Sequence, residues 1–280
     1  MSRLNKPRII PVKEIFTYLF LTAGLVAVLF PFVWMLLSAF KTGADVYTYP
    51  PKWIPTVWKL DNFAKVFKMV PFARYYFNSF FVTGLITLGQ IFVSMLAGYA
   101  LARLDFPFKN SIFVVILSTM LLPFQVTLIP TFLIINKLEW IDTYQGLIVP
   151  FLFAGFSIFF LRQFFLTIPL DLYEAAKIDG CGYFGILFKV ILPNARPALG
   201  TISLFTYLEF WRSYLWPLIV TNSTRMRTLP IGLNYLMSEG GGEYQLMMAA
   251  SLLTIVPVLI VYAFAEKQFI KSVVMTGIKN

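Results

Sequence analysis

Residues 167–180 read TIPLDLYEAAKIDG, and residues 181–193 continue as CGYFGILFKVILP. Pro169 suits a first helical turn, and Asp171 complements the positive end of that helix. Gly180 is a natural stop just past the last turn. A second short helix is expected from Tyr183 to Ile191, before Pro193 ends it. The stretch therefore predicts a compact helix–glycine–helix loop.

Apolar runs lie on both sides of this loop, each long enough to cross a hydrocarbon layer of about 30 Å. They fall near residues 15–37, 78–101, 111–135, 144–161, 197–220 and 246–264. Hydrophobic residues make up 59% of the chain and charged residues 13%, whereas an ordinary globular domain carries about 25% charged residues. The sequence therefore predicts an all-α membrane protein with six transmembrane helices.

Basic residues set the expected orientation, because cytoplasmic loops of membrane proteins are enriched in Lys and Arg. Placing both tails and the loops after the second and fourth runs in the cytoplasm puts thirteen Lys and Arg on that side and nine on the other. We therefore expect cytoplasmic tails at residues 1–14 and 270–280, a six-helix domain at residues 15–269, and a cytoplasmic loop at residues 167–196. The loop at residues 221–245 is expected on the opposite side. The net charge of +10 suits a protein that faces anionic lipid.

The composition excludes several kinds of chemistry. The chain has no histidine, which removes His-ligated metal sites and Ser-His-Asp triads. Cys181 is the only cysteine, so neither an internal disulfide nor a cysteine cluster for a metal is possible. No glycine is followed by lysine, so the phosphate-binding loop of ATP-hydrolysing proteins is missing. We expect this chain to carry no catalytic residue, metal or cofactor of its own.

The helix between Pro169 and Gly180 lies outside the apolar runs and allows two interpretations. It could form, with the helix that follows, an amphipathic hairpin that lies on the membrane surface. Alternatively, the small side chains of Ala175 and Ala176 leave a smooth face on which another protein can approach closely, and Glu174 supplies one charge beside it. Composition leaves both interpretations open.

A family pattern becomes visible at this loop. Glu174-Ala-Ala, three further residues, Gly180 and a stretch that ends in Leu-Pro together resemble the cytoplasmic signature loop of binding-protein-dependent ABC importer permeases. Nearly the whole chain shares the likeness. Four further motifs resemble the carbohydrate branch of the family, in particular the maltose-type second permease subunit. They are Asn78-Ser79 at the start of the second run, Leu-Ala-Arg at its end, Leu-Trp-Pro in the fifth run, and the C-terminal Phe-Ile-Lys-Ser.

This resemblance implies the type I ABC importer permease fold, with coupling helices between the fourth and fifth spans. It implies an ATP-driven importer of a sugar or oligosaccharide in a bacterial or archaeal cytoplasmic membrane, with both termini in the cytoplasm. The implied partners are a second, related permease subunit, two ABC ATPase subunits that hold ATP and Mg, and an extracytoplasmic solute-binding protein. The ATPase-coupling residues carried over by the motif are Glu174, Ala175, Ala176, Asp179 and Gly180.

The family also has an extracytoplasmic scoop loop that enters the binding protein. Residues 221–245, with Gly240, Gly241 and Gly242, occupy its place in this chain. Glycines without side chains would let such a loop enter a cleft. A flexible surface turn explains the same residues.

The sequence departs from the family pattern after Trp211, where a small polar residue is usual and this chain has Arg212. A charge at membrane depth costs at least about 2.5–3.5 kcal/mol. Glu209 lies three residues earlier, a spacing that shares a helix face, so we expect the two charges to neutralise each other. Alternatively, the pair lines the translocation path with Tyr207 and Trp211 and contacts the solute.

Prolines fall within five of the six predicted spans, where each removes an amide donor and kinks its helix. The freed carbonyls need partners in hydrocarbon, so such breaks belong against other helices or along a wet cavity. Pro123 and Pro130 frame the polar Gln125 within one span, which makes Gln125 a further candidate for the pathway.

Other functions remain as alternatives. Related permeases serve glycerol phosphodiesters, polyols and uronate-containing oligosaccharides, and Arg212 is compatible with an anion. An ion-coupled secondary transporter would often show internal repeats and midplane carboxylates, but the sequence has no repeat and only Glu209 within a span. An integral-membrane enzyme would need convergent acids or histidines. ATP dependence of uptake distinguishes the importer from the secondary transporter, and turnover by the isolated chain would indicate the enzyme.

Overall fold

The computed structural model describes residues 12–239 and 243–277, and every regular element in these ranges is a helix. This confirms the all-α prediction. The chain contacts divide into two compact units, each described separately below. Of the described residues, the first unit comprises 12–69, 236–239 and 243–253, and the second comprises 70–235 and 254–277.

The first unit begins with α1 (Val12–Ala39), which is followed by α2 (Gly43–Val46) and α3 (Asp61–Met69). Several polar side chains contact one another at the C-terminal end of α1. The amide of Asn62 donates to the carbonyls of Ala39 and Lys41, each at 2.9 Å. The Lys41 ammonium is fully buried and lies 3.7 Å from the centre of the Trp34 ring.

Asp45 fixes the loop that follows α1. Its carboxylate accepts hydrogen bonds from the Thr56 hydroxyl and from Lys52 Nζ, the latter at 3.0 Å. These bonds, from Thr56 first and Lys52 second, hold the pKa of Asp45 well below its usual range. The carboxylate is therefore ionised at neutral pH and ties three parts of the loop together.

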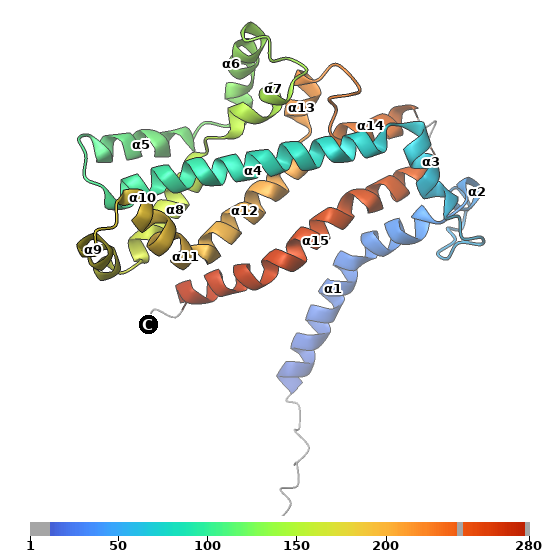
Figure 1. The fold of residues 1–280 in the computed structure, drawn as a ribbon. Helices are drawn as coiled ribbons and strands as arrows, with labels where there is room; N and C mark the ends of the chain where they lie inside the picture. The colour runs from blue at the N-terminus through green and yellow to red at the C-terminus, as the bar shows by residue number, and fades with distance from the viewer. Residues whose placement is uncertain (1–11, 240–242, 278–280) are drawn as a thin grey trace, which may run out of the picture. The chain divides into compact units, whose positions relative to one another are not determined.

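The second unit is built around α4 (Phe72–Arg103), which packs most extensively against α8 (Gly155–Thr167) and α12 (Arg196–Trp211). At Gly98 an added Cβ would lie 3.1 Å from the backbone nitrogen of Arg162, so the absent side chain lets α8 approach the backbone of α4 closely. Figure 1 shows α4 as the long helix along which the other helices of this unit are arranged.

The remaining helices follow the chain in order. They are α5 (Lys109–Thr119), α6 (Phe124–Lys137), α7 (Tyr144–Ile148), η1 (Val149–Phe151), α9 (Leu170–Ile178), α10 (Tyr183–Ile186), η2 (Leu187–Ile191), α11 (Leu192–Asn194), α13 (Leu215–Val220), α14 (Leu229–Glu239) and α15 (Tyr244–Gly277). The predicted helix–glycine–helix loop is confirmed as α9, Gly180 and the helical run from α10 to α11. That run continues one residue past Pro193, which occupies its last turn.

The apolar runs form continuous helices in only part of the chain. Among the described residues, three single helices are long and apolar enough to cross a membrane, namely residues 13–39, 72–103 and 244–263. Two further runs are bent pairs, α5 with α6 at 99° and the α7–η1 segment with α8 at 44°. The fifth run, expected as one span over residues 197–220, is divided between α12 with 16 residues and α13 with 6 residues, so it does not form one continuous helix.

Polar side chains at both ends of α4 fasten neighbouring loops. Near its beginning, the amide nitrogen of Asn78 donates to the carbonyls of Arg225 and Arg227, each at 2.8 Å. At its end, Arg103 donates to the carbonyl of Phe165 at 2.6 Å and also to that of Ile168. The loop after α13 and the loop before α9 are therefore held at opposite ends of one helix.

Candidate functional site

An open cavity of about 870 Å³ lies where the broken helices of the second unit meet. Its walls come from α4, from the break between α5 and α6, from the segment joining η1 to α8, and from the break between α12 and α13. Binding sites for small molecules commonly measure about 300–1,000 Å³. The cavity is thus large enough for a small solute.

The cavity lining combines aromatic rings with a limited set of polar groups. The aromatic members are Phe124, Phe151, Phe153, Phe156, Phe205, Phe210 and Trp216, and the uncharged polar members are Gln90, Thr119, Thr127, Ser157, Thr206 and Ser213. Rings offer flat apolar faces, whereas hydroxyls and amides both donate and accept hydrogen bonds. Such a lining suits a solute that has apolar faces and many hydroxyl groups.

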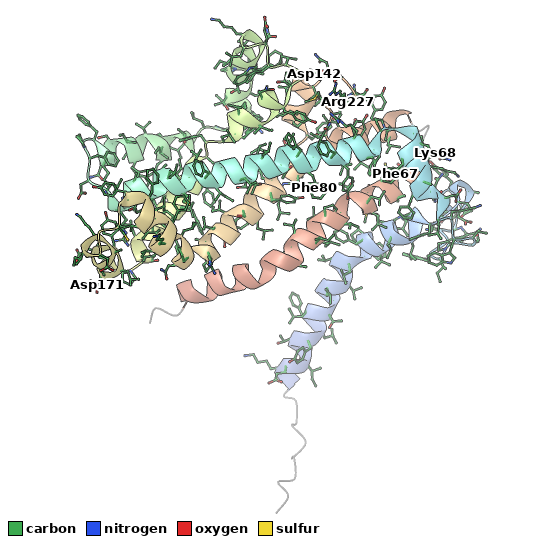
Figure 2. All side chains as sticks on the ribbon, in the orientation of Figure 1. Phe67, Lys68, Phe80, Asp142, Asp171 and Arg227 are labelled. Atoms are coloured by element: carbon green, nitrogen blue, oxygen red, sulfur yellow. The ribbon has the colours of Figure 1, made fainter. Side chains whose placement is uncertain are left out.

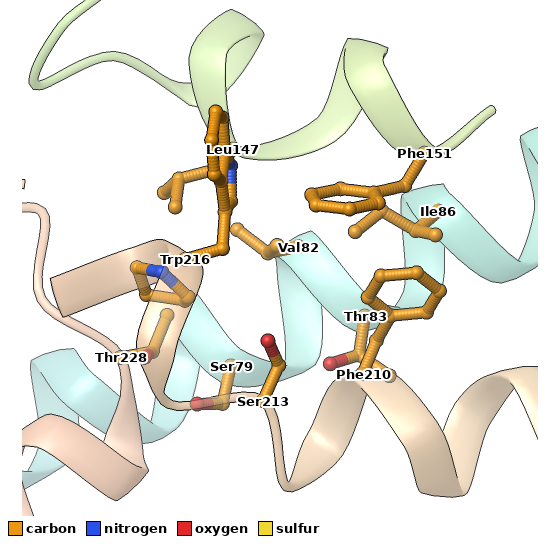
Figure 3. Close-up of a pocket in the computed structure, with 11 residues that line it drawn as sticks. Ser79, Val82, Thr83, Ile86, Leu147, Phe151, Phe210, Ser213, Trp216 and Thr228 are labelled. Carbon is orange, nitrogen blue, oxygen red and sulfur yellow. The ribbon is translucent and has the colours of Figure 1, made fainter. Parts of the chain in front are cut away.

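Three of these rings separate the cavity from a second, much smaller pocket. Phe151, Phe210 and Trp216 line both spaces, and the Phe151 ring centre lies 4.9 Å from that of Phe210 and 5.7 Å from that of Trp216. The small pocket measures about 10 Å³, which is room for about one water molecule. Figure 3 shows the ring of Phe151 above that of Phe210, with Thr83 next to Phe210, and the two ring planes are inclined by 56°. The rings therefore form a partition at one end of the cavity.

The structure corrects the expected ion pair between Glu209 and Arg212. Both side chains are exposed and both line the cavity. Salt bridges in the described part of the chain join Lys52 to Asp45, Lys65 to Asp61 and Lys109 to Asp105, and none joins Glu209 to Arg212. The helix α12 ends at Trp211, so the regular i, i+3 geometry that would hold the two side chains against each other is interrupted at Arg212.

Tyr207 and Trp211 do not line the cavity with the two charged residues. Their rings stack on each other, with centres 5.6 Å apart and planes inclined by 16°. Trp211 is buried, and its indole nitrogen donates to the carbonyl of Thr254 at 3.2 Å. The i, i+4 spacing of Tyr207 and Trp211 puts them on one face of α12, away from the face that carries Glu209. The sequence made all four residues candidates for the translocation path, but only Glu209 and Arg212 line the cavity.

Gln125 also falls outside the cavity lining. The break that Pro123 imposes is confirmed, because α5 ends at Thr119 and α6 begins at Phe124. Gln125 is exposed on the first turn of α6, whereas its neighbours Phe124 and Thr127 line the cavity. Pro130 lies within α6 without ending it. The polar residue that the prolines frame is therefore turned away from the space that the break creates.

The predicted coupling residues lie together on and after α9. Glu174, Ala175, Asp179 and Gly180 are exposed, in agreement with a surface role. Ala176 is not part of that surface, because it is 7% exposed and packs into the core of the unit. Of the two alanines expected to form a smooth exposed face, only Ala175 is therefore on the surface.

Gly180 ends α9 through its backbone conformation. Its φ angle is +79°, a value that side-chain-bearing residues rarely adopt. An added Cβ would meet no atom within 4 Å, so crowding is not the reason for glycine here. Figure 2 shows Asp171 at the outer edge of the same helix. The local sequence therefore fixes both the length of α9 and the direction of the chain that leaves it.

The described part of the loop at the other end of α4 is firmly held. The Asp142 carboxylate accepts from the backbone nitrogens of Asn222 and Ser223, each at 2.9 Å. Burial raises the pKa of Asp142, but the bonds from Ser223 and Asn222 and the positive charge of Arg227 lower it by more. Figure 2 shows Asp142 and Arg227 near each other. Gly240, Gly241 and Gly242, the predicted contacts of the binding protein, lie outside the described residues.

Comparison with known protein families identifies the family of this chain. Residues 90–271 match the model of the binding-protein-dependent transport system inner membrane component. The chain belongs to this family. It is a multi-pass membrane permease of a binding-protein-dependent transport system, and its role is transport.

Relatives of known name agree with this assignment. The arabinooligosaccharides transport system permease protein AraQ of Bacillus subtilis is 36% identical over 255 residues, which cover 90% of this chain and 91% of that protein. The sn-glycerol-3-phosphate transport system permease protein UgpE of Yersinia enterocolitica is 32% identical and covers 93% of this chain and 96% of its own length.

A solved structure confirms the permease fold. A chain from a bacterial ABC transporter involved in the import of the acidic polysaccharide alginate superposes with a TM-score of 0.83 over 94% of this permease and 100% of that chain. The sequence identity is 24%, so the likeness concerns the fold. The expected type I ABC importer permease fold is therefore present in this protein.

No metal site is found among the side chains that the structure describes. Within residues 13–236 and 243–263, no group of three or more His, Cys, Asp or Glu side chains is placed to hold an ion. Residues that sequence reasoning did not single out are Gln90, Ser157 and Thr206, which meet at the cavity wall. Their only signal in the sequence is a polar side chain within an apolar run.

Because Glu209 and Arg212 do not neutralise each other, replacing one should not strand the other. We expect Arg212→Asn and Glu209→Gln each to change the free energy of unfolding by less than about 1 kcal/mol. The double variant should show the sum of the two effects. Thermal unfolding of the purified complex in detergent measures this. Single losses of about 3–5 kcal/mol that are rescued in the double variant would establish the ion pair after all.

Proposed function

We propose that this permease is the membrane subunit of an ATP-driven importer that moves a sugar or oligosaccharide across the cytoplasmic membrane. The observation that carries the proposal is the cavity of about 870 Å³, whose aromatic and hydroxyl-bearing walls match a hydroxyl-rich solute. A relative at 36% identity is named as a permease for arabinooligosaccharides, which supports the same substrate class.

Glu209 and Arg212 are proposed to contact the solute. Both reach the cavity, and neither is held by the other. A carboxylate accepts hydrogen bonds from hydroxyl groups, and a guanidinium donates to hydroxyl or carboxylate oxygens. One acceptor and one donor on the same wall can therefore hold a sugar ring from two of its substituents.

Arg212 also favours a second candidate. A guanidinium without an acidic partner binds carboxylate and phosphate groups well. A uronate-containing oligosaccharide or a glycerol phosphodiester would use it in this way, and UgpE, a relative at 32% identity, is named for sn-glycerol-3-phosphate transport. Glu209 argues against an anionic solute, because its negative charge lies on the same wall of the cavity and would repel an anion.

The partners follow from the same proposal. The exposed residues Glu174, Ala175, Asp179 and Gly180 would contact one of two ABC ATPase subunits, which hold ATP and Mg. A second, related permease subunit would complete the pathway, and a solute-binding protein would deliver the sugar from outside. In this arrangement both termini and α9 face the cytoplasm, and the loop after α13 faces outward. The contact of Arg103 with the last carbonyls of α8 would pass movement of α9 to α4.

Uptake by the complete complex in proteoliposomes tests the proposed function. With binding protein outside and ATP inside, we expect import of a neutral oligosaccharide, and Arg212→Asn should raise its KM about threefold, because one hydrogen bond to a neutral hydroxyl is weakened. For a uronate oligosaccharide or a glycerol phosphodiester, the same change should reduce import at least about tenfold if the second candidate is correct. No import of any of the three solutes by the wild-type complex would contradict both candidates.

Crosslinking tests the coupling surface. In a Cys181→Ser background, Ala175→Cys should crosslink to a cysteine placed on the facing surface of the ATPase subunit, because Ala175 is exposed on α9. Asn222→Cys, exposed at the opposite end of α4, is the matched control and should not react with the same partner. The proposed docking surface is wrong if the assembled, transporting complex gives no crosslink through Ala175→Cys, or an equal one through Asn222→Cys.

A further inference from the structure

Gln90 lies near the middle of α4 and joins three walls of the cavity. Its side chain is 5% exposed, so it reaches the cavity surface with little of its area. Its Nε2 donates to the carbonyl of Phe151 at 3.1 Å. Its Oε1 accepts from the hydroxyl of Thr206 at 2.6 Å and from that of Ser157 at 3.3 Å. Both polar atoms of Gln90 are therefore used within the protein.

The carbonyl that Gln90 holds belongs to a helix end. Phe151 is the last residue of η1, and α8 begins only at Gly155 after a bend of 44°. Carbonyls at the end of a helix have no partner in their own helix, and leaving one unpaired away from water is costly. The Gln90 amide supplies the missing donor and so holds the bend in place.

A side chain of the same bend packs against the backbone of α4. One residue before Gln90, a Cβ added to Gly89 would lie 2.5 Å from Cδ2 of Leu152, the residue that follows η1. The absence of a side chain at Gly89 thus leaves room for the Leu152 side chain next to Gln90. The Gln90 hydrogen bond and the space at Gly89 therefore both place the segment after η1 against α4.

The third contact of Gln90 reaches the helix that carries Glu209. Thr206 is 4% exposed and lies three residues before Glu209, so both are on neighbouring turns of one face of α12. The bond from Thr206 to Gln90 fixes that face against α4. The position of Glu209 in the cavity therefore depends on a side chain of another helix.

We propose that Gln90 is the positioning residue of the cavity, which sets the distance between the α8 and α12 walls without itself binding the solute. This rests on the proposed function in one respect, namely that the cavity is the path of the solute. Loss of the Gln90 contacts should loosen the two walls, because the carbonyl of Phe151 and the hydroxyls of Ser157 and Thr206 lose their partner together.

The test uses the assembled complex with Cys181→Ser and Glu209→Cys, and an anionic thiol reagent as the probe. We expect Gln90→Leu to change the labelling rate of Glu209→Cys at least about fivefold. In complexes that retain Glu209, Gln90→Leu should raise the KM for import about tenfold, with the maximal rate per assembled complex little changed. The control is Thr87→Val, because the buried Thr87 hydroxyl on the same helix has no hydrogen bond within the described residues.

Two further variants keep the test decisive if Gln90→Leu does not assemble. Thr206→Val removes only the 2.6 Å bond, and Gln90→Glu keeps the acceptor but removes the donor to Phe151. Each should reproduce part of the change, about threefold. Labelling and KM within twofold of wild type in any assembled variant would overturn the proposal. Labelling needs no solute, so a wild-type complex that imports nothing would refute the proposed function while the labelling result still decides on Gln90.

Discussion

Hydrogen bonds from α4 side chains to main-chain carbonyls of other segments are the constraint on which the second unit depends. Carbonyls at the ends of helices need donors, and away from water only the protein can supply them. Asn78 serves the loop after α13, Gln90 serves the end of η1, and Arg103 serves the end of α8. These contacts join residues 61 to 149 positions apart in the chain. One continuous helix thereby makes discontinuous helices possible around it.

The same contacts connect the parts that transport requires. The breaks that α4 stabilises create the cavity, since the walls turn away from one another where α5, η1 and α12 end. The ends of α4 hold the segment before α9 and the loop after α13. A movement of α9 would therefore reach the cavity through a rigid helix. The proposed ATP-driven import needs such a link, because the ATPase would act at one face while the solute is held elsewhere.

Local sequence predicted what local forces determine. The apolar runs gave the helices, and Pro169 and Gly180 gave the limits of α9 within one or two residues. Pro123 predicted the break before α6, while Pro130 lies inside α6 because the turn of helix around it is otherwise continuous. The separation of Glu209 from Arg212 was not predictable, since it follows from the end of α12 at Trp211. Gln90 was missed because its partners lie 61, 67 and 116 residues away.

The central claim is that side chains of α4 hold the broken segments, and hydrogen–deuterium exchange in an Arg103→Met complex tests it most directly. Methionine matches the length of the arginine stem but cannot donate to the carbonyls of Phe165 and Ile168. The account predicts at least about tenfold faster exchange of the backbone amides in residues 166–182. Exchange in residues 144–152, which Gln90 holds, should stay unchanged. Unaltered exchange across residues 166–182 in a fully assembled variant would contradict the claim.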